Sequence, residues 1–200
     1  MKIILVSHPS RAHHVARLQE HLTVTTTIVD TVSAWSGHLT ALRMAAQLDE
    51  RVAIMEDDAI PVERFDELSD YWAMERPNDL LSFYLGTSRP RELQAVIASK
   101  IADADRRGQH EIWLSPLIHG VCYSVPTPGL PALIAKMEKP SRIREADYAI
   151  GVAWGREVCY PLESLVQHRD EAPVERHPDG LPRNEPRIAR RLAGTLMFTS

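Results

Sequence analysis

Three consecutive carboxylates, Glu56, Asp57 and Asp58, follow directly after the apolar run 52–55. Ligand sites in open α/β sheets lie beyond the carboxyl ends of strands, where these residues would stand. Side chains alternate along an extended chain, so we expect Glu56 and Asp58 to face one side and Asp57 the other. Two convergent carboxylates are hard oxygen ligands for Mg²⁺ or Mn²⁺, and a metal held in this way can neutralise a diphosphate. The alternative is an acidic turn in which Asp57 or Asp58 caps the following segment.

Residues farther along the chain could complete such a site. His168 ends a short apolar run and could give the same metal a nitrogen ligand, although a lone histidine is more often an ordinary hydrogen-bonded residue. His119 and a glycine precede a predicted strand, where the backbone can approach a ligand closely; a turn at the strand entry is the alternative. Asp147 stands at a predicted helix start, either as a catalytic base or as a group that satisfies the free amides of the first turn.

Apolar runs and helical periodicities alternate along the chain, which predicts an α/β fold with a largely parallel sheet. The predicted extended segments are 2–7, 23–29, 52–55, 80–85, 111–115, 120–125 and 157–160. The predicted helices are 12–22, 39–48, 65–74, 92–107, 130–137 and 147–154. Prolines recur from residue 172 onward, so we expect an extended segment there. The prediction is one domain, residues 1–172, followed by a Pro/Arg-rich C-terminal arm, residues 173–200.

The composition is that of a globular protein. The chain has 200 residues, 44% hydrophobic and 25% charged, which is enough for one buried core and excludes disorder, collagen and coiled coil. The apolar run 3–6 is far shorter than the ~18 residues of a spanning helix or the ~7 to 15 of a signal-peptide core. We expect a soluble, cytoplasmic protein without a membrane span. Cys122 and Cys159 have apolar neighbours, which favours buried thiols over a disulfide.

Charge is distributed unevenly along the sequence. The formal net charge of −4 argues against a whole-surface attraction to nucleic acid. Segment 176–200 nevertheless carries five arginines against two acidic residues, so it holds +3 and the remainder of the chain −7. This segment could touch phosphates or an anionic surface, and the alternative is a solvated extension with a short helix.

Several short strings occur together in an order that resembles a known family over residues 1–170. They are IMEDDA at 54–59, WSGHL at 35–39, the histidine, tyrosine and serine of 119–124 before the helix 130–137, the acidic segment 145–147, and the run 161–168 that ends in Gln-His. The family is that of the glycosyltransferases of the lipooligosaccharide-biosynthesis type (family 25-like), which have a GT-A fold. The opening strand departs from the family pattern, because Ser-His-Pro-Ser-Arg follows it where the family has an asparagine and a spaced arginine.

The resemblance implies a single GT-A-like, Rossmann-like domain with a mainly parallel sheet flanked by helices. It implies transfer of a sugar from a nucleotide-diphosphate donor, most often a UDP-sugar, to a hydroxyl of a glycan, a protein or modified DNA, with Mn²⁺ or Mg²⁺ and by an inverting route. The nucleotide sugar would lie on Ser7, His8, Arg11, Trp35, His38, Glu56, Asp57 and His119. The metal would lie on Asp58, Glu56 and His168, and the catalytic base would be Asp147 or Glu145.

Three other functions use the same residues. The acceptor could be a hydroxymethylated base in DNA, with the arginines of segment 176–191 on phosphates and a steep salt dependence of binding. A carboxylate-bound metal could instead serve hydrolysis or nucleotidyl transfer. The chain could also be a non-catalytic module that binds a nucleotide sugar or a carbohydrate.

Overall fold

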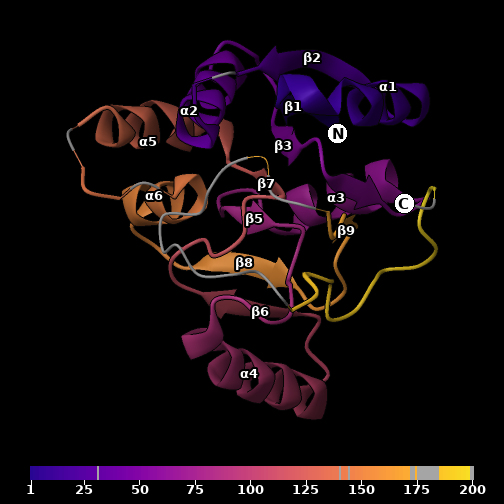
Figure 1. Ribbon diagram of the computed structural model, residues 1–200. Coiled ribbons are helices and arrows are strands. Elements are labelled where there is room, and N and C mark those ends of the chain that lie inside the picture. The colour runs from indigo at the N-terminus through magenta and orange to yellow at the C-terminus, as the bar shows by residue number, and fades with distance from the viewer. Residues whose placement is uncertain (31, 140, 144, 172–173, 175–184, 199–200) are drawn as a thin grey trace.

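The computed structural model describes residues 1–30, 32–139, 141–143, 145–171, 174 and 185–198. Across these residues, one sheet of seven strands forms the centre of the molecule (Figure 1). Its strands, in spatial order, are β2 (Val24–Val29), β1 (Lys2–Ser7), β3 (Val52–Glu56), β7 (Cys122–Ser124), β5 (Leu81–Ser82), β8 (Val158–Pro161) and β6 (Glu111–Leu114). The predicted α/β class is confirmed.

The sheet is mixed, which corrects the expectation of a mainly parallel one. Strand β1 pairs in parallel with β2 and β3, and β5 pairs in parallel with β8. Strand β7 lies antiparallel between β3 and β5, and β6 is antiparallel to β8. The alternation of strands and helices predicts parallel neighbours only where a helix crosses back over the sheet, so that the next strand begins at the same end as the previous one. The insertion of β7 between two earlier strands is a long-range pairing that no local pattern indicates.

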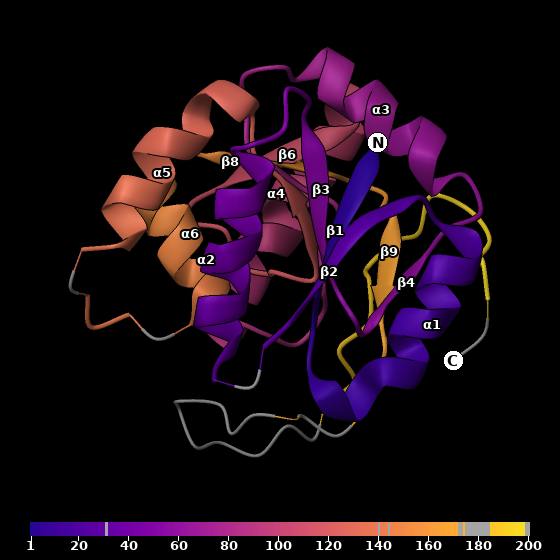
Figure 2. The ribbon, with the colours of Figure 1, turned by 90° about the horizontal axis from the view of Figure 1, so that it is seen from above.

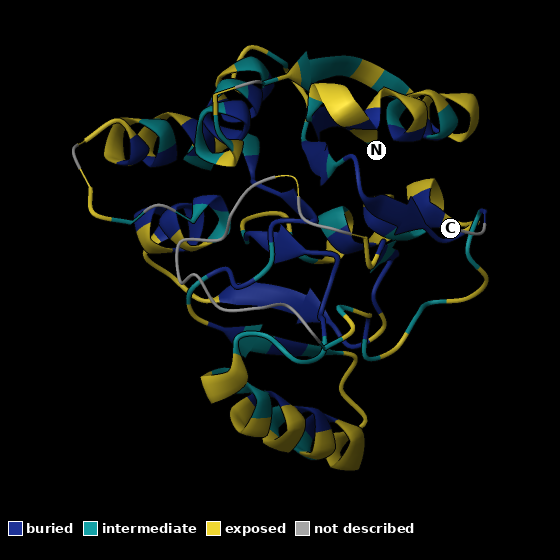
Figure 3. Ribbon diagram, in the orientation of Figure 1, coloured by how far each residue is buried: buried dark blue, intermediate teal, exposed yellow. Residues whose placement is uncertain are grey.

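Helices cover both faces of this sheet, as Figure 2 shows. They are α1 (Ala12–His21), α2 (Ala34–Ala45), α3 (Phe65–Glu75), α4 (Gln94–Arg107), α5 (Leu130–Met137) and α6 (Ala146–Trp154). The apolar residues form two buried clusters because side chains alternate along the strands. Ile4 of β1 belongs to a cluster that also includes residues of α2, α4, α5 and α6, whereas its neighbours Ile3 and Leu5 belong to a cluster that includes residues of α1 and α3. The central strands are accordingly buried on both faces (Figure 3).

Helix α2 begins at Ala34, five residues before the predicted start. Ser33 precedes the helix and its side chain accepts a hydrogen bond from the backbone N–H of Ser36 at 3.2 Å. The segment 35–38 is therefore helical rather than a turn. Gly37 weakens the helical signal of the sequence, but a Cβ at this position would lie 2.9 Å from Cγ1 of Val6. The glycine is required by close packing of the helix on β1.

A second, two-stranded sheet was not predicted. Strand β4 (Ala59–Pro61) pairs antiparallel with β9 (Val166–His168), and Ala59 lies opposite His168. The short apolar run that ends at His168 is thus a strand, and its pairing brings this histidine to the end of the acidic segment.

The C-terminal segment 185–198 packs on the domain in an extended course. It forms isolated bridges between Val62 and Leu196, between Gly86 and Ala189, and between Ser164 and Leu192. Ala189 and Phe198 are buried. The alternative of a solvated extension with a short helix is wrong for this segment, because no helix occurs within 185–198. Most of the remaining arm, 172–173 and 175–184, lies outside the described residues.

Cys122 and Cys159 are free, buried thiols, as predicted. Within the described part of the chain, no helix has both the length and the apolar character needed to cross a membrane.

Gly151 gives a direct test of how α6 packs. A Cβ built on Gly151 would lie 2.0 Å from the backbone nitrogen of Leu117 and 2.6 Å from Cβ of Pro116. Gly151→Ala therefore requires the helix to move, and we expect the free energy of unfolding to fall by about 1–3 kcal/mol or more. Val152→Ala, on the exposed side of the same helix, should change it by less than about 0.5 kcal/mol. Equal urea-unfolding midpoints for the two variants would contradict this packing.

Candidate functional site

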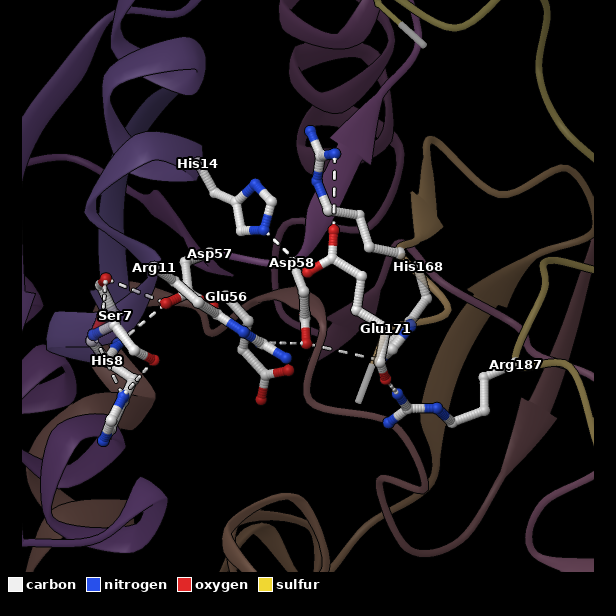
Figure 4. Close-up of polar contacts among 12 residues, drawn as sticks. Ser7, His8, Arg11, His14, Glu56, Asp57, Asp58, His168, Glu171 and Arg187 are labelled. Atoms are coloured by element: carbon white, nitrogen blue, oxygen red, sulfur yellow. Dashed lines mark hydrogen bonds and ion pairs between the residues drawn. The ribbon is translucent and has the colours of Figure 1, made fainter. Parts of the chain in front are cut away.

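The first polar cluster lies where β1 and its parallel neighbour β3 end. Ser7 closes β1 and is buried, and Asp57 follows β3 and is buried as well. One oxygen of Asp57, Oδ2, accepts hydrogen bonds from Ser7 Oγ at 2.9 Å and from the backbone N–H of His8 at 2.8 Å. Asp57 therefore fixes the turn that follows β1, as Figure 4 shows.

Arg11 holds the two aspartates together. The 3₁₀ turn Pro9–Arg11 carries this side chain, which is 7% exposed. Its Nη1 donates to Asp57 Oδ1 at 3.0 Å and to Asp58 Oδ2 at 2.7 Å. Both aspartates thus turn toward one guanidinium, which corrects the expected alternation of Glu56 and Asp58 against Asp57. Alternation stops because β3 ends at Glu56, and Asp57 and Asp58 lie in the turn before β4.

Asp58 is a buried carboxylate that lies between Arg11 and His168. His168 Nε2 lies 3.5 Å from Asp58 Oδ2. Burial alone would raise the pKa of Asp58, but the nearby charges of His168, Arg11 and Arg187 outweigh it and hold this pKa below the ordinary value. Asp58 is therefore ionised at neutral pH. Its second oxygen, Oδ1, is buried and has no hydrogen-bond partner in the described part of the chain.

The expected metal set of Asp58, Glu56 and His168 is not assembled as a group. Among the described residues, no three His, Cys, Asp or Glu side chains are arranged to hold a metal ion. The Glu56 carboxylate instead bonds to His38. Asp58 and His168 remain adjacent, and the buried Oδ1 of Asp58 is an oxygen without a partner. One carboxylate and one imidazole fit a divalent ion that takes its other ligands from a diphosphate and water.

The second cluster lies on the other side of the end of β3. His38 of α2 is 1% exposed, and its Nε2 lies 3.0 Å from Glu56 Oε1. Its Nδ1 lies 3.0 Å from the hydroxyl of Tyr123 on β7. Sequence reasoning did not include Tyr123 among the site residues, because a tyrosine inside an apolar strand gives no signal of a polar role. The Glu56 side chain is 29% exposed, so this buried chain of hydrogen bonds ends at the surface.

Asp147 lies beside Glu56, in the first turn of α6. A Cβ built on Gly120 would be 3.1 Å from Glu56 Oε1 and 3.3 Å from Asp147 Cβ, so both acidic side chains border this glycine. Asp147 Oδ1 accepts the backbone N–H of Tyr148 at 2.7 Å. Burial, helped by the negative charge of Glu56, raises the pKa of Asp147 to about 6. Asp147 thus both satisfies an amide of the helix start and has the proton affinity of a base that works near neutral pH.

Two further predicted binding residues are Trp35 and His119. Trp35 lines a hollow of about 220 Å³ between α2, α5 and α6, together with Met137 and Ile143. His119 donates from Nε2 to the carbonyl of Arg89 at 3.0 Å, and burial lowers its pKa to about 4, so the ring is neutral. Its ring contacts Tyr84, with the ring centres 5.1 Å apart.

The remaining predicted residues fall into two places. Ser7 and His8 line a hollow of about 140 Å³ between α1 and the ends of β1 and β2, with Gln19 as a further polar side chain. Glu145 directly precedes α6, and its side chain does not cap that helix. The structure thus brings Ser7, His8, Arg11, Asp57, Asp58 and His168 into one cluster and His38, Glu56 and Asp147 into a second.

No family model and no curated protein matches the chain. Comparison of folds does find similar structures. One of them is titled "Crystal Structure of A197 from STIV", with a TM-score of 0.51, 9% sequence identity, and coverage of 100% of this chain and 99% of that one. At this identity the likeness shows a shared α/β fold alone.

The raised pKa of Asp147 predicts a pH dependence of stability. In the unfolded chain an aspartate titrates near pH ~3.9, whereas Asp147 in the fold titrates at about 6. Between these values the folded protein keeps a proton that the unfolded chain has lost, so the contribution of Asp147 to stability falls as pH rises. We expect the free energy of unfolding of Asp147→Asn, relative to that of wild type, to increase as the pH rises from 4 to 7. Urea unfolding at each pH checks this, and a constant difference across the range would contradict it.

Proposed function

We propose that this protein is a glycosyltransferase that moves a sugar from a nucleotide-diphosphate donor to an acceptor hydroxyl. One observation carries the proposal. The end of β3 lies between a carboxylate–imidazole pair, Asp58 and His168, and a carboxylate with raised proton affinity, Asp147. Asp58 and His168 suit a diphosphate with its cation, and Asp147 suits a base for the attacking hydroxyl. The GT-A resemblance of the sequence supports the same assignment.

The hollow beside Ser7 and His8 is the proposed position of the nucleoside. It lies between β1, β2 and α1 at the carboxyl edge of the parallel strands, where ligands bind in α/β folds. Asp57 has both oxygens engaged by Ser7, His8 and Arg11. We therefore assign to Asp57 the role of holding the turn after β1, rather than direct contact with the ribose.

Asp58 and His168 would hold the divalent cation, Mn²⁺ or Mg²⁺, which when bound supplies positive charge for the departing diphosphate. Arg11 fixes the direction of the Asp58 carboxylate through its contact with Oδ2. This leaves Oδ1 as the free oxygen of Asp58. Asp58 stays ionised because the charges of His168 and Arg11 offset the cost of its burial.

Asp147 is the proposed base. With a pKa of about 6, its carboxylate is ionised at neutral pH and retains enough proton affinity to accept a proton. It would take the proton of the acceptor hydroxyl as that oxygen forms its bond to the anomeric carbon and the bond from that carbon to the diphosphate breaks. Attack from the side opposite the diphosphate corresponds to the inverting route.

Release of nucleotide diphosphate tests the proposed function. The protein is incubated with UDP-, GDP-, CDP- and TDP-sugars and Mn²⁺, with and without a mixture of simple glycosides as acceptors, and the products are separated by mass. We expect one nucleotide class to be released, faster with an acceptor and slower with a chelator. No release above the protein-free control, from protein that unfolds cooperatively, would overturn the proposal.

The described arginines of the C-terminal segment do not favour DNA as the acceptor. Arg191 makes two hydrogen bonds to Asp105, at 2.8 and 2.7 Å. Arg187 donates to the carbonyl of Glu171 at 2.9 Å, and Arg190 donates to Gln94. These contacts tie the segment to the domain, so we place the acceptor among small glycans or proteins rather than nucleic acid.

A further inference from the structure

We infer that Glu56 is a positioning residue of the reaction centre, held beside Asp147 by the hydrogen-bonded chain of Tyr123 and His38, and that it contacts neither the nucleotide nor the metal. This inference rests on the proposed function for its chemistry. Its geometry is independent of that function. It replaces the role that the sequence suggests, in which Glu56 binds the metal together with Asp58.

The direction of the hydrogen bonds in this chain follows from its two ends, because the Glu56 carboxylate only accepts and the Tyr123 hydroxyl can donate. Burial, together with the charge of Glu56, raises the pKa of Tyr123, so its hydroxyl keeps the proton. The hydroxyl can then donate to Nδ1 of His38 at 3.0 Å, which leaves the ring proton on Nε2. Nε2–H donates in turn to Glu56 Oε1, also at 3.0 Å. The chain thus fixes the carboxylate of Glu56 in one direction.

Gly120 allows the side chains of Glu56 and Asp147 to lie next to each other. The Cβ that any other residue would add lies 3.1 Å from Glu56 Oε1 and 3.3 Å from Asp147 Cβ, and 3.7 Å from Cε1 of His38. At the first two distances the acidic side chains would have to give way by a few tenths of an ångström. The glycine that the sequence suggested for a close approach to ligand instead gives room to the carboxylate pair.

The pairing has a chemical consequence for Asp147. A fixed negative charge beside a carboxyl group favours its protonated form, so it strengthens Asp147 as a proton acceptor. The other ionisable groups around Asp147 are His38 on α2, Glu145 before α6, Tyr123 on β7 and Tyr160 on β8. Glu56 is a carboxylate that the buried His38 holds in place. Glu56 thus acts on the reaction through Asp147.

Carboxyl-carbon nuclear magnetic resonance of Asp147 tests this inference. Wild type, Glu56→Gln and Tyr123→Phe are titrated from pH 3 to 9, with Glu63→Gln, an exposed acidic residue, as the matched control. We expect the Asp147 midpoint to fall clearly in Glu56→Gln, to fall less in Tyr123→Phe, and to stay at the wild-type value in Glu63→Gln. An unchanged midpoint in both Glu56→Gln and Tyr123→Phe would overturn the pairing, and using two variants guards against one that fails to fold.

Calorimetric titration of Glu56→Gln with UDP and Mn²⁺ separates the two roles of Glu56. An affinity within twofold of wild type supports a position away from the nucleotide and metal, and a loss of tenfold or more would overturn it. If wild type binds no nucleotide, the proposed function fails, whereas the Asp147 titration still decides whether the two carboxylates are paired.

Discussion

Asp147→Asn is expected to slow sugar transfer by about 10²- to 10⁴-fold, the usual contribution of a general base. Asparagine has nearly the same shape and keeps an oxygen that can accept the N–H of Tyr148, but it cannot take a proton from a hydroxyl. The expected loss is therefore in kcat, with nucleotide affinity preserved. Initial rates of nucleotide release and calorimetry with UDP measure the two quantities on the same samples.

The control for this prediction is Glu157→Gln, which removes an exposed acidic side chain shortly after α6. It should transfer sugar at the wild-type rate. An Asp147→Asn variant that also kept the wild-type rate would show that Asp147 is not the base, and Glu145 would then be tested by Glu145→Gln. A wild type without turnover that nevertheless binds a nucleotide would indicate a binding module.

Arg11→Gln is expected to lower the free energy of unfolding by about 3–5 kcal/mol, the usual cost of removing one partner of a buried ion pair. The reason is the balance of charge around Asp57 and Asp58, which are 4% and 6% exposed and share one guanidinium nitrogen. In Arg11→Gln the two neighbouring carboxylates stay buried but lose the positive charge of this guanidinium. Urea unfolding at pH 7 measures the loss, and the loss should shrink as the pH falls through the lowered pKa of Asp58, because the protonated carboxyl no longer needs the cation.

Arg64→Gln is the matched control for Arg11→Gln. Arg64 pairs with Glu67 three residues away on an exposed surface, where an ion pair adds little to stability. Its unfolding midpoint should equal that of wild type. If Arg11→Gln unfolded at that same midpoint, the account of Arg11 as the cation that balances the two buried aspartates would be contradicted.

Local patterns in the sequence predict most of the elements and part of the site. The apolar run before Glu56 is strand β3, and the acidic residues do stand at its carboxyl end. Because β1 and β3 are parallel neighbours, Ser7 and Asp57 meet at one edge, as expected of an α/β fold. His168 also lies beside Asp58, as the sequence suggests. The first two predictions succeed because they depend on the ends of predicted strands, whereas His168 reaches Asp58 through the unpredicted pairing of β4 with β9.

The missed features depend on residues far apart in the sequence. Gly37 lowers helix propensity, so the true start of α2 and the inward position of His38 were not evident. Tyr123 resembles a core residue until β7 inserts beside β3 and places its hydroxyl against His38. Glu56 and Asp58 separate because the strand ends between them, and a pattern of alternation does not predict where a strand ends.

Calorimetric titration of wild type and Asp58→Asn with UDP, GDP, CDP and TDP tests the nucleotide-diphosphate site most directly. Each titration is run with Mn²⁺ and again with a chelator. We expect that one nucleotide binds to wild type in the presence of Mn²⁺, and that the chelator and the Asp58→Asn substitution each weaken this binding. Absence of binding by all four nucleotides in both conditions, by folded protein, would contradict the proposed function.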